Sequence, residues 1–259
     1  SVGYRIMINL VTLSGNSERF TSKNLSHKAL CLIDGETMIS HFVKSFPDFN
    51  RYPSIFLCRQ EDLDSGLMSE EIRKHVRSPS IYGIERNSLG PVYSISQIFK
   101  KIPDDDSILV SYIDAPQKIS LEKIIQDFSD CESGLSVHDF KNPHWKRSKS
   151  YCLVKHNDSL EVKEVIEKFD FSAFDFATPN AAGSSGSYYF SSGSLMKKEF
   201  NKLIQSSLTV NGEYYVTQAV GALSERGAKV KCSYYPYASL GVPEDLEDYE
   251  FWSKWFSDK

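Results

Sequence analysis

The segment Tyr4-Arg-Ile-Met-Ile-Asn-Leu-Val-Thr-Leu13 runs directly into Ser14-Gly-Asn-Ser17. Its apolar and β-branched residues are typical of a buried β-strand, and the small polar residues after it predict a loop. The glycine in this loop would let backbone N–H groups approach a phosphate, although a plain turn glycine is the more frequent alternative. This junction predicts an α/β fold in which the end of the first strand can bind an anion.

Strand and helix patterns alternate through the first 130 residues. Apolar residues at helical spacing from Met38 to Phe46 predict a helix that ends at Pro47. The short apolar runs 54–58 and 107–113 are typical of buried strands. Because strands that alternate with helices form mostly parallel sheets covered on both faces, we predict a Rossmann-like α/β fold with a mostly parallel mixed central sheet.

The second half of the chain has a more mixed pattern, and neither an internal repeat nor a linker-like change of composition marks a boundary. The sequence therefore predicts a single domain over residues 1–259. The elements predicted in this half are sheet segments over 151–154 and 162–166, helices over 195–208 and 215–226, a strand over 230–234 and a closing helix over 246–256.

The composition limits the function classes. Apolar residues make up 41% of the 259 residues, which is enough for a packed core, and a net charge of −4 argues against a general nucleic-acid surface. The five cysteines are scattered without a C-x-x-C pair, which favours reduced thiols over a zinc or redox site. The longest apolar run, Ile6 to Leu13, is too short to cross a bilayer. We expect a cytoplasmic protein that binds neither nucleic acid nor membrane.

Three charged residues are candidates for phosphate chemistry. Asp114 follows the strand pattern 107–113, and ligands of open α/β sheets bind at the carboxyl ends of the strands. A carboxylate there can hold Mg²⁺, or it can be an ordinary turn or cap residue. Arg19 and Lys28 lie just beyond the first loop and could neutralise a triphosphate, while solvated surface cations are the alternative.

Taken in order, these features resemble the sugar-phosphate nucleotidyltransferases, which include hexose-1-phosphate thymidylyl- and uridylyltransferases and phosphocholine cytidylyltransferases. The similarity is greatest to the short members linked to capsule and surface-polysaccharide synthesis, and it covers residues 8–255. The segments that carry it are Leu13-Ser-Gly-Asn-Ser-Glu-Arg-Phe20, Lys28 to Ile39, Phe56 to Leu63, Gly90-Pro-Val92, Ser111-Tyr-Ile-Asp114, Asn142-Pro-His-Trp145, Val162 to Lys168, Gly186-Ser-Tyr-Tyr-Phe190, Asn211 to Val216 and Leu240-Gly-Val-Pro-Glu-Asp-Leu246.

The resemblance implies a GT-A-like nucleotidyltransferase fold, with a nucleotide-binding half at 1–130 and an acceptor-binding half at 131–259. It also implies an activity: an NMP passes from an NTP to a phosphorylated small molecule, such as a sugar 1-phosphate, and pyrophosphate is released with the help of Mg²⁺. The sequence leaves the base open among CTP, UTP and dTTP. A homo-oligomer or a fused partner domain also stays open.

The resemblance further assigns roles to individual residues by their position in the motifs. The catalytic residues are Arg19, Lys28 and Asp114, of which Asp114 also holds the metal, with Glu213 as a candidate second ligand. The nucleotide-binding residues are Leu13, Ser14, Gly15, Asn16, Ser17, Arg59, Gly90 and Pro91. The acceptor-binding residues are Glu167, Lys168, Gly186 and Glu213.

Four positions depart from the family pattern. Ser17 replaces a loop glycine, His27 a proline, Glu36 a lysine and Ser239 the second metal-binding acid. These changes leave room for altered substrate choice and for a nucleotide-binding homologue with weakened catalysis. A further alternative is a nucleotide-sugar-dependent glycosyltransferase of the GT-A type, which would want a D-x-D-like motif where this chain has a single acid at Asp114.

Overall fold

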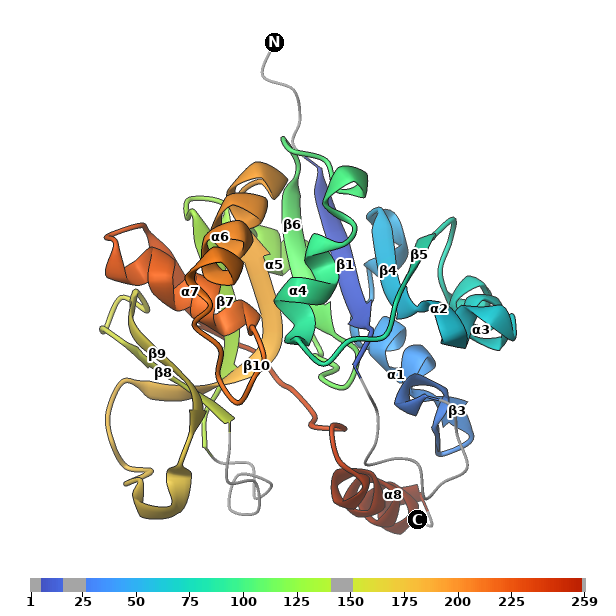
Figure 1. Ribbon diagram of the computed structural model, residues 1–259. Coiled ribbons are helices and arrows are strands. Elements are labelled where there is room, and N and C mark those ends of the chain that lie inside the picture. Colours follow the sequence, from blue (N-terminus) through green and yellow to red (C-terminus); the bar gives the residue numbers. More distant parts are fainter. Residues whose placement is uncertain (1–5, 16–26, 141–150, 258–259) are drawn as a thin grey trace.

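The structure, a computed structural model, describes residues 6–15, 27–140 and 151–257. Its centre is a twisted sheet whose first half is entirely parallel (Figure 1). The strands of this half are β1 (Met7–Leu13), β4 (Ser54–Arg59), β5 (Ser80–Ile84) and β6 (Ser107–Tyr112). β1 lies between β4 and β6, and β5 forms the edge beyond β4.

The second half of the chain extends the same sheet beyond β6. β10 (Ala181–Phe190) runs antiparallel to β6 on one side and to β7 (Ser133–His138) on the other, and β11 (Val230–Tyr234) pairs parallel with β7. A hairpin of β8 (Tyr151–His156) and β9 (Val162–Phe169) joins through β10. The predicted mostly parallel mixed sheet is therefore confirmed.

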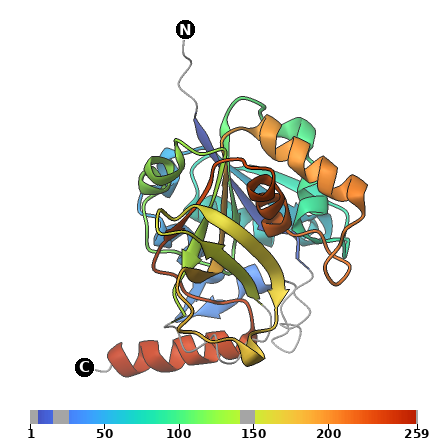
Figure 2. The ribbon, with the colours of Figure 1, turned by 90° about the vertical axis from the view of Figure 1, so that its left-hand side faces the viewer.

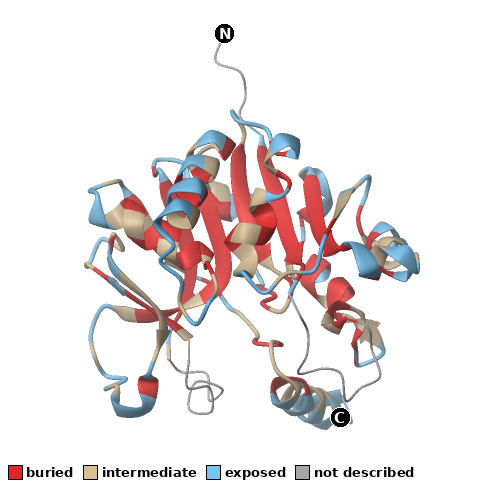
Figure 3. Cartoon of the chain, viewed as in Figure 1, coloured by how far each residue is buried: buried red, intermediate tan, exposed pale blue. Residues whose placement is uncertain are grey.

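Helices cover both faces of the sheet, as predicted, and enclose two apolar clusters (Figure 3). On one face lie α4 (Gly90–Ser96), α6 (Gly193–Ser206) and α7 (Val216–Glu225), and on the other lie α1 (Met38–Ser45), α3 (Leu67–His75) and α5 (Leu121–Phe128). The remaining elements are α2 (Gln60–Asp64), α8 (Pro243–Ser257) and a small hairpin of β2 (Leu32–Ile33) and β3 (Glu36–Thr37).

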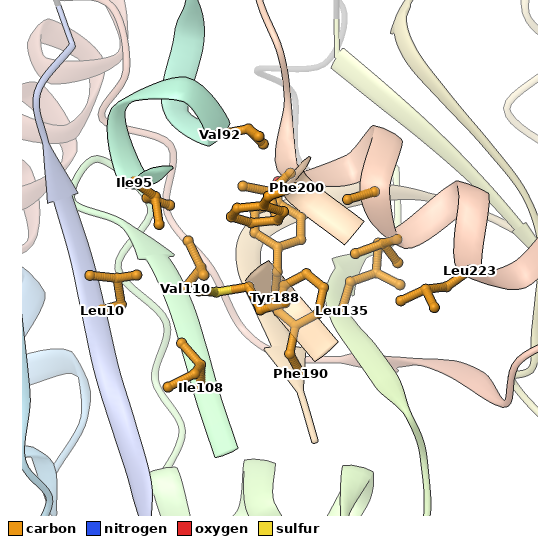
Figure 4. Packing of buried hydrophobic residues seen from close by; sticks show 14 of the residues in the cluster. Leu10, Val92, Ile95, Ile108, Val110, Leu135, Tyr188, Phe190, Phe200 and Leu223 are labelled. Carbon is orange, nitrogen blue, oxygen red and sulfur yellow. The ribbon is translucent and has the colours of Figure 1, made fainter. Parts of the chain in front are cut away.

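The core follows from side-chain alternation along the central strands. In β6, Ile108 and Val110 enter the cluster under α4 and α6, whereas Leu109 enters the opposite cluster. Phe190 of β10 meets Phe200 of α6 edge to face, with ring centroids 5.5 Å apart (Figure 4). Burial on both faces explains why these strands read as continuous apolar runs in the sequence.

Several elements were not predicted from the sequence. β10 contains Gly183, Ser184, Ser185 and Gly186, which have weak strand propensity, and its register with β7 shifts between Ser184 and Tyr188. Its pairing with strands on both sides holds it in the sheet. The strands β5 and β7 and the helix α5 were also missed.

The structure tests what the composition predicted about the cysteines and about membrane-spanning segments. All five cysteines are buried and none of them forms a disulfide, as their scattered spacing predicted. Burial raises the pKa of Cys58 and of Cys232 to about 12, so neither thiol is an activated nucleophile. Across residues 6–15, 27–140 and 151–257, none of the helices is both long enough and apolar enough to span a bilayer.

Candidate active site

Two adjoining cavities lie where β1 and β6 end. Figure 1 shows these strand ends at the lower edge of the sheet. The first, of about 210 Å³, is lined by the loop after β1, the start of α4 and the segment around Glu213. The second, of about 230 Å³, is lined by β9, β10 and the 239–245 segment. Tyr112, Asp114 and Tyr215 line both cavities, so a molecule in one can meet a molecule in the other at these residues.

An ion pair between Lys28 and Asp114 stands at this junction. Lys28 Nζ donates a hydrogen bond to Asp114 Oδ2 across 86 positions of sequence, and the two side chains are 18% and 22% exposed. Burial by itself would raise the pKa of Asp114, but the charge and the hydrogen bond of Lys28 outweigh it and hold that pKa below its usual value. The carboxylate is therefore ionised at neutral pH, and the fold brings together the cation and the acid that the sequence singled out.

Three predicted acceptor residues meet in the second cavity. Lys168, whose backbone is left-handed (φ 55°), places Nζ 5.1 Å from the centroid of the Tyr215 ring. The neighbouring Glu167 accepts a hydrogen bond from Thr217, and burial raises the pKa of Glu167. Gly186 has φ 86°, and a Cβ there would lie 2.8 Å from the Cβ of Ala115. Gly186 and Ala115, which follows Asp114, thus meet at the wall of the second cavity.

The second cavity also contains a hydroxyl group without a protein partner. Ser185 is 1% exposed, and its Oγ has no hydrogen-bond acceptor or donor among the described residues. Since a buried hydroxyl without a partner costs free energy, this group is suited to a ligand that offers a hydrogen bond in return.

Gly90 shapes the wall of the first cavity. Its φ is 88°, and a Cβ would lie 2.8 Å from both the backbone N and the backbone O of Tyr214. Around it, Tyr214 N donates to Leu89 O at 2.9 Å, and Val92 N donates to Tyr214 O at 3.2 Å. The missing side chain thus allows two backbone segments to meet and brings Pro91 and Glu213 onto one wall.

Gly90→Ala is expected to lower the free energy of unfolding by about 3 kcal/mol, because a side chain there combines left-handed strain with overlap on a fixed backbone. Gly212→Ala is the matched control, since Gly212 has a similar φ of 82° but open space around it. It should cost only about 1 kcal/mol. Urea unfolding of both variants measures the difference, and equal losses would show that the contact with Tyr214 is unimportant.

Comparison with known proteins identifies the family. The sequence profile described as Nucleotidyl transferase matches residues 14–225, which is most of the chain and includes the loop after β1, Lys28 and Asp114. The chain belongs to this nucleotidyl transferase family. Among curated proteins it is similar to the bifunctional protein GlmU of Marinobacter nauticus, with 24% identity over 193 residues, covering 73% of the chain and 40% of that protein. The chain spans about half or less of the curated relatives it matches.

Solved structures share the fold of this nucleotidyltransferase. A nucleoside-diphosphate-sugar pyrophosphorylase from Vibrio cholerae superposes with a TM-score of 0.75 at 18% identity, over 95% of this chain and 100% of that one. A UDP-glucose pyrophosphorylase complexed with UDP-glucose gives a TM-score of 0.72 at 13% identity, over 98% and 100%. At these identities the likeness establishes the fold.

Of the remaining predicted site residues of the nucleotidyltransferase, some line the first cavity and one lies outside both cavities. Arg59 is 3% exposed, its guanidinium pairs with both Asp62 oxygens at 2.6 and 2.8 Å, and it does not line either cavity. Glu213 lies in the first cavity, apart from the other predicted acceptor residues. Leu13, Ser14 and Gly15 line the first cavity, whereas positions 16, 17 and 19 lie outside the described residues.

His27, which stands where the family has proline, has a structural role that the sequence did not reveal. Its Nδ1 accepts a hydrogen bond from Ala29 N at 3.0 Å and so caps the helical turn that begins at Lys28. Burial and the charges of Lys28 and Arg59 lower its pKa to about 3. The ring is therefore neutral at pH 7, and it positions Lys28 without adding charge to the site.

Ser239, at the position of the family's second metal-binding acid, also has a different partner. Its Oγ donates to Asp245 at 2.6 Å, while Leu240 N donates to the Asp114 carbonyl at 2.9 Å. No group of three His, Cys, Asp or Glu side chains suited to a metal occurs in the described parts of the chain. Mg²⁺ commonly takes one or two carboxylates and completes its shell with phosphate oxygens and water. Asp114 would supply the one carboxylate that a magnesium ion of that kind requires.

Proposed function

We propose that this nucleotidyltransferase transfers an NMP from an NTP to a sugar 1-phosphate with release of pyrophosphate, in a Mg²⁺-dependent reaction. The observation that carries the proposal is the meeting of two cavities at Asp114, with one cation, Lys28, on its carboxylate and another, Lys168, beside Tyr215. We further propose a cytoplasmic role in surface-polysaccharide precursor synthesis, because the sequence resembles the family members linked to that pathway.

In the proposed reaction, a phosphate oxygen of the acceptor attacks the α-phosphorus of the NTP in line. The new O–P bond forms as the bond to the bridging oxygen breaks, and pyrophosphate leaves with that electron pair. No protein base is needed because the nucleophile is already an anion. Catalysis then depends on positioning and charge neutralisation.

The residues divide this work between the two cavities. The backbone of Ser14 and Gly15 would hold the triphosphate in the first cavity, and Lys28 would neutralise charge at the α-phosphate. Lys168 would bind the acceptor phosphate where the cavities meet. Magnesium bound by Asp114 would supply Lewis-acid stabilisation of the charge that develops on the phosphate chain.

The hydroxyl-rich wall of the second cavity favours a sugar as acceptor. A sugar offers several groups that both donate and accept hydrogen bonds, which can satisfy the buried Ser185 hydroxyl. The Glu167 carboxyl can accept from a further hydroxyl. A trimethylammonium group has no such hydrogen-bonding capacity. The UDP-glucose pyrophosphorylase of the same fold, complexed with a nucleotide sugar, is consistent with this class.

A matrix of CTP, UTP, dTTP and ATP against hexose 1-phosphates, inositol 1-phosphate and phosphocholine, with pyrophosphate as the readout, tests the proposal. We expect pyrophosphate release with at least one sugar 1-phosphate, and we expect EDTA to abolish this release. NTP binding by calorimetry without turnover on any acceptor would instead identify a non-catalytic homologue. Hydrolysis of a nucleotide sugar without pyrophosphate chemistry would indicate a glycosyltransferase.

Ser185→Ala is expected to raise KM for the sugar phosphate about tenfold with kcat nearly unchanged, because one hydrogen bond to the bound acceptor is lost in ground and transition state alike. Steady-state kinetics with the best substrate pair measures this effect. Ser129→Ala, at an exposed serine after α5, is the control and should leave both constants unchanged. An unaltered KM in Ser185→Ala would remove this hydroxyl from acceptor recognition.

A further inference from the structure

The closing helix α8 carries an exposed aromatic surface. Phe251, Trp252, Trp255 and Phe256 are each 53 to 65% exposed. Their rings form one stripe, with centroids 5.3 Å apart between Phe251 and Trp252 and 6.1 Å apart between Trp252 and Phe256. In Figure 2 this helix extends beyond the body of the molecule. A contiguous apolar patch of this kind marks an interaction site, and we call it the aromatic ridge.

A large apolar groove lies beside the ridge. It has a volume of about 880 Å³ and is formed by α1, by the segments 116–120 and 236–240, and by Tyr249 from the inner side of α8. Three prolines, Ile119 and Leu240 contribute to its apolar lining. The ridge lies beside this groove on the same face of the protein. Trp252 and Phe256 line a neighbouring cavity together with Tyr237 and Ala238, which also line the groove, and all four ridge side chains stay more than half exposed.

The charges of the two surfaces are complementary. The described groove lining contains Lys44, Lys118 and His41 and no acidic residue, although Lys44 also pairs with Glu36 at 2.6 Å. In contrast, α8 carries five acidic residues against a single lysine, and four of the five are at least partly exposed, whereas Asp245 is buried and accepts a hydrogen bond from Ser239. Glu247 is exposed one helical turn before Phe251, on the line that leads to Trp255. The acidic side chains beside the aromatic ridge are therefore complementary in charge to the basic side chains of the groove.

We propose that the aromatic ridge of one copy docks in the groove of a second copy, and the reverse, to form a two-fold symmetric dimer. Side chains of this type bury about 150–250 Å² each, so their exposed parts offer roughly 400–500 Å² per ridge. Two ridges and two grooves then bury about 1,600–2,000 Å², the size of a stable interface. Reciprocal docking of two different surfaces on one chain is what two-fold symmetry requires.

This dimer would also support the acceptor cavity. The segment between β11 and α8 presents Tyr237 and Ser239 to the second cavity and Pro236, Ala238 and Leu240 to the groove. A ridge seated in the groove would therefore restrain the segment that packs against Asp114. The association itself is independent of the proposed reaction, and its measurement needs no substrate.

Light scattering after size-exclusion chromatography of the full chain tests the proposal. We expect twice the chain mass of 29.4 kDa at tens of micromolar. The double variant Trp255→Ser/Phe256→Ser should be monomeric and equally folded by circular dichroism, because both side chains are exposed. Leu208→Ser is the matched control, since Leu208 is 67% exposed just beyond the C-terminal end of α6, and should remain dimeric.

Exchanging one charge on α8 with one charge in the groove tests how the ridge is oriented in the groove. Glu247→Lys and Lys118→Glu should each weaken the dimer about tenfold, and the combined variant should recover most of the loss. A wild-type chain that stays monomeric, or a dimer that survives loss of the ridge aromatics, would overturn the proposal. Additive rather than compensating charge variants would overturn the assigned pairing of the two surfaces.

Discussion

Asp114→Asn is expected to lower kcat of the pyrophosphate-releasing reaction about a thousandfold. Asparagine is nearly isosteric and its amide oxygen can still accept from Lys28, so the local packing against Gly241 should persist. The variant loses the negative charge that would bind Mg²⁺ at the junction of the two cavities. A thousandfold loss corresponds to about 4 kcal/mol of transition-state stabilisation, within the range for a metal ligand.

Measurements at saturating NTP, acceptor and Mg²⁺ give kcat for pyrophosphate release. Urea unfolding verifies that the fold is intact. Asp130→Asn serves as the control, because this carboxylate lies on the surface in a pair with Lys229. It should retain wild-type kcat. Wild-type turnover in Asp114→Asn would remove Asp114 from the reaction and, with it, the proposed site.

Lys28→Met is expected to lower kcat by about 10² to 10³ and also to destabilise the protein at neutral pH. The kinetic loss follows from removal of the cation proposed to neutralise charge at the α-phosphate. The stability loss, about 2 kcal/mol at pH 7, follows because Asp114 keeps its charge in a site that is mostly shielded from water without its partner.

The pH dependence of that stability loss has a definite sign. In the wild type the pKa of Asp114 is lowered, so this carboxylate stabilises the fold above its unfolded-state pKa, and the contribution is lost as the pH falls. Without Lys28, burial would raise the pKa of Asp114 instead, and protonation would relieve the penalty in acid. The difference between wild type and Lys28→Met should therefore shrink between pH 7 and pH 4.

Urea unfolding at several pH values measures this difference. Lys28→Arg is the matched variant: it restores the ion pair and should recover stability, while kcat recovers only in part because the guanidinium has a different shape. A difference between wild type and Lys28→Met that stays constant with pH would mean that Asp114 is not the group that the lysine stabilises.

The amino-acid sequence determined where the first cavity lies. β1 and β6 were recognisable as buried strands, and residues that follow parallel strands meet at one edge of the sheet. The sequence alone therefore placed the glycine loop and Asp114 at the same edge of the sheet. Lys28 was a candidate from its place just beyond the first loop, the family motif gave it a role, and the ion pair with Asp114 agrees with that placement.

Only the tertiary structure decided the rest of the pocket. β10 is a strand because neighbours pair with it on both sides, which its small residues do not signal. The same packing gives Gly186 its contact with Ala115 and buries the Ser185 hydroxyl. Arg59 is withdrawn from the pocket by Asp62, since two buried charges are most stable in a two-fold hydrogen-bonded pair. Local patterns specify strands and loops, whereas partners distant in the chain determine which polar groups stay free for a ligand.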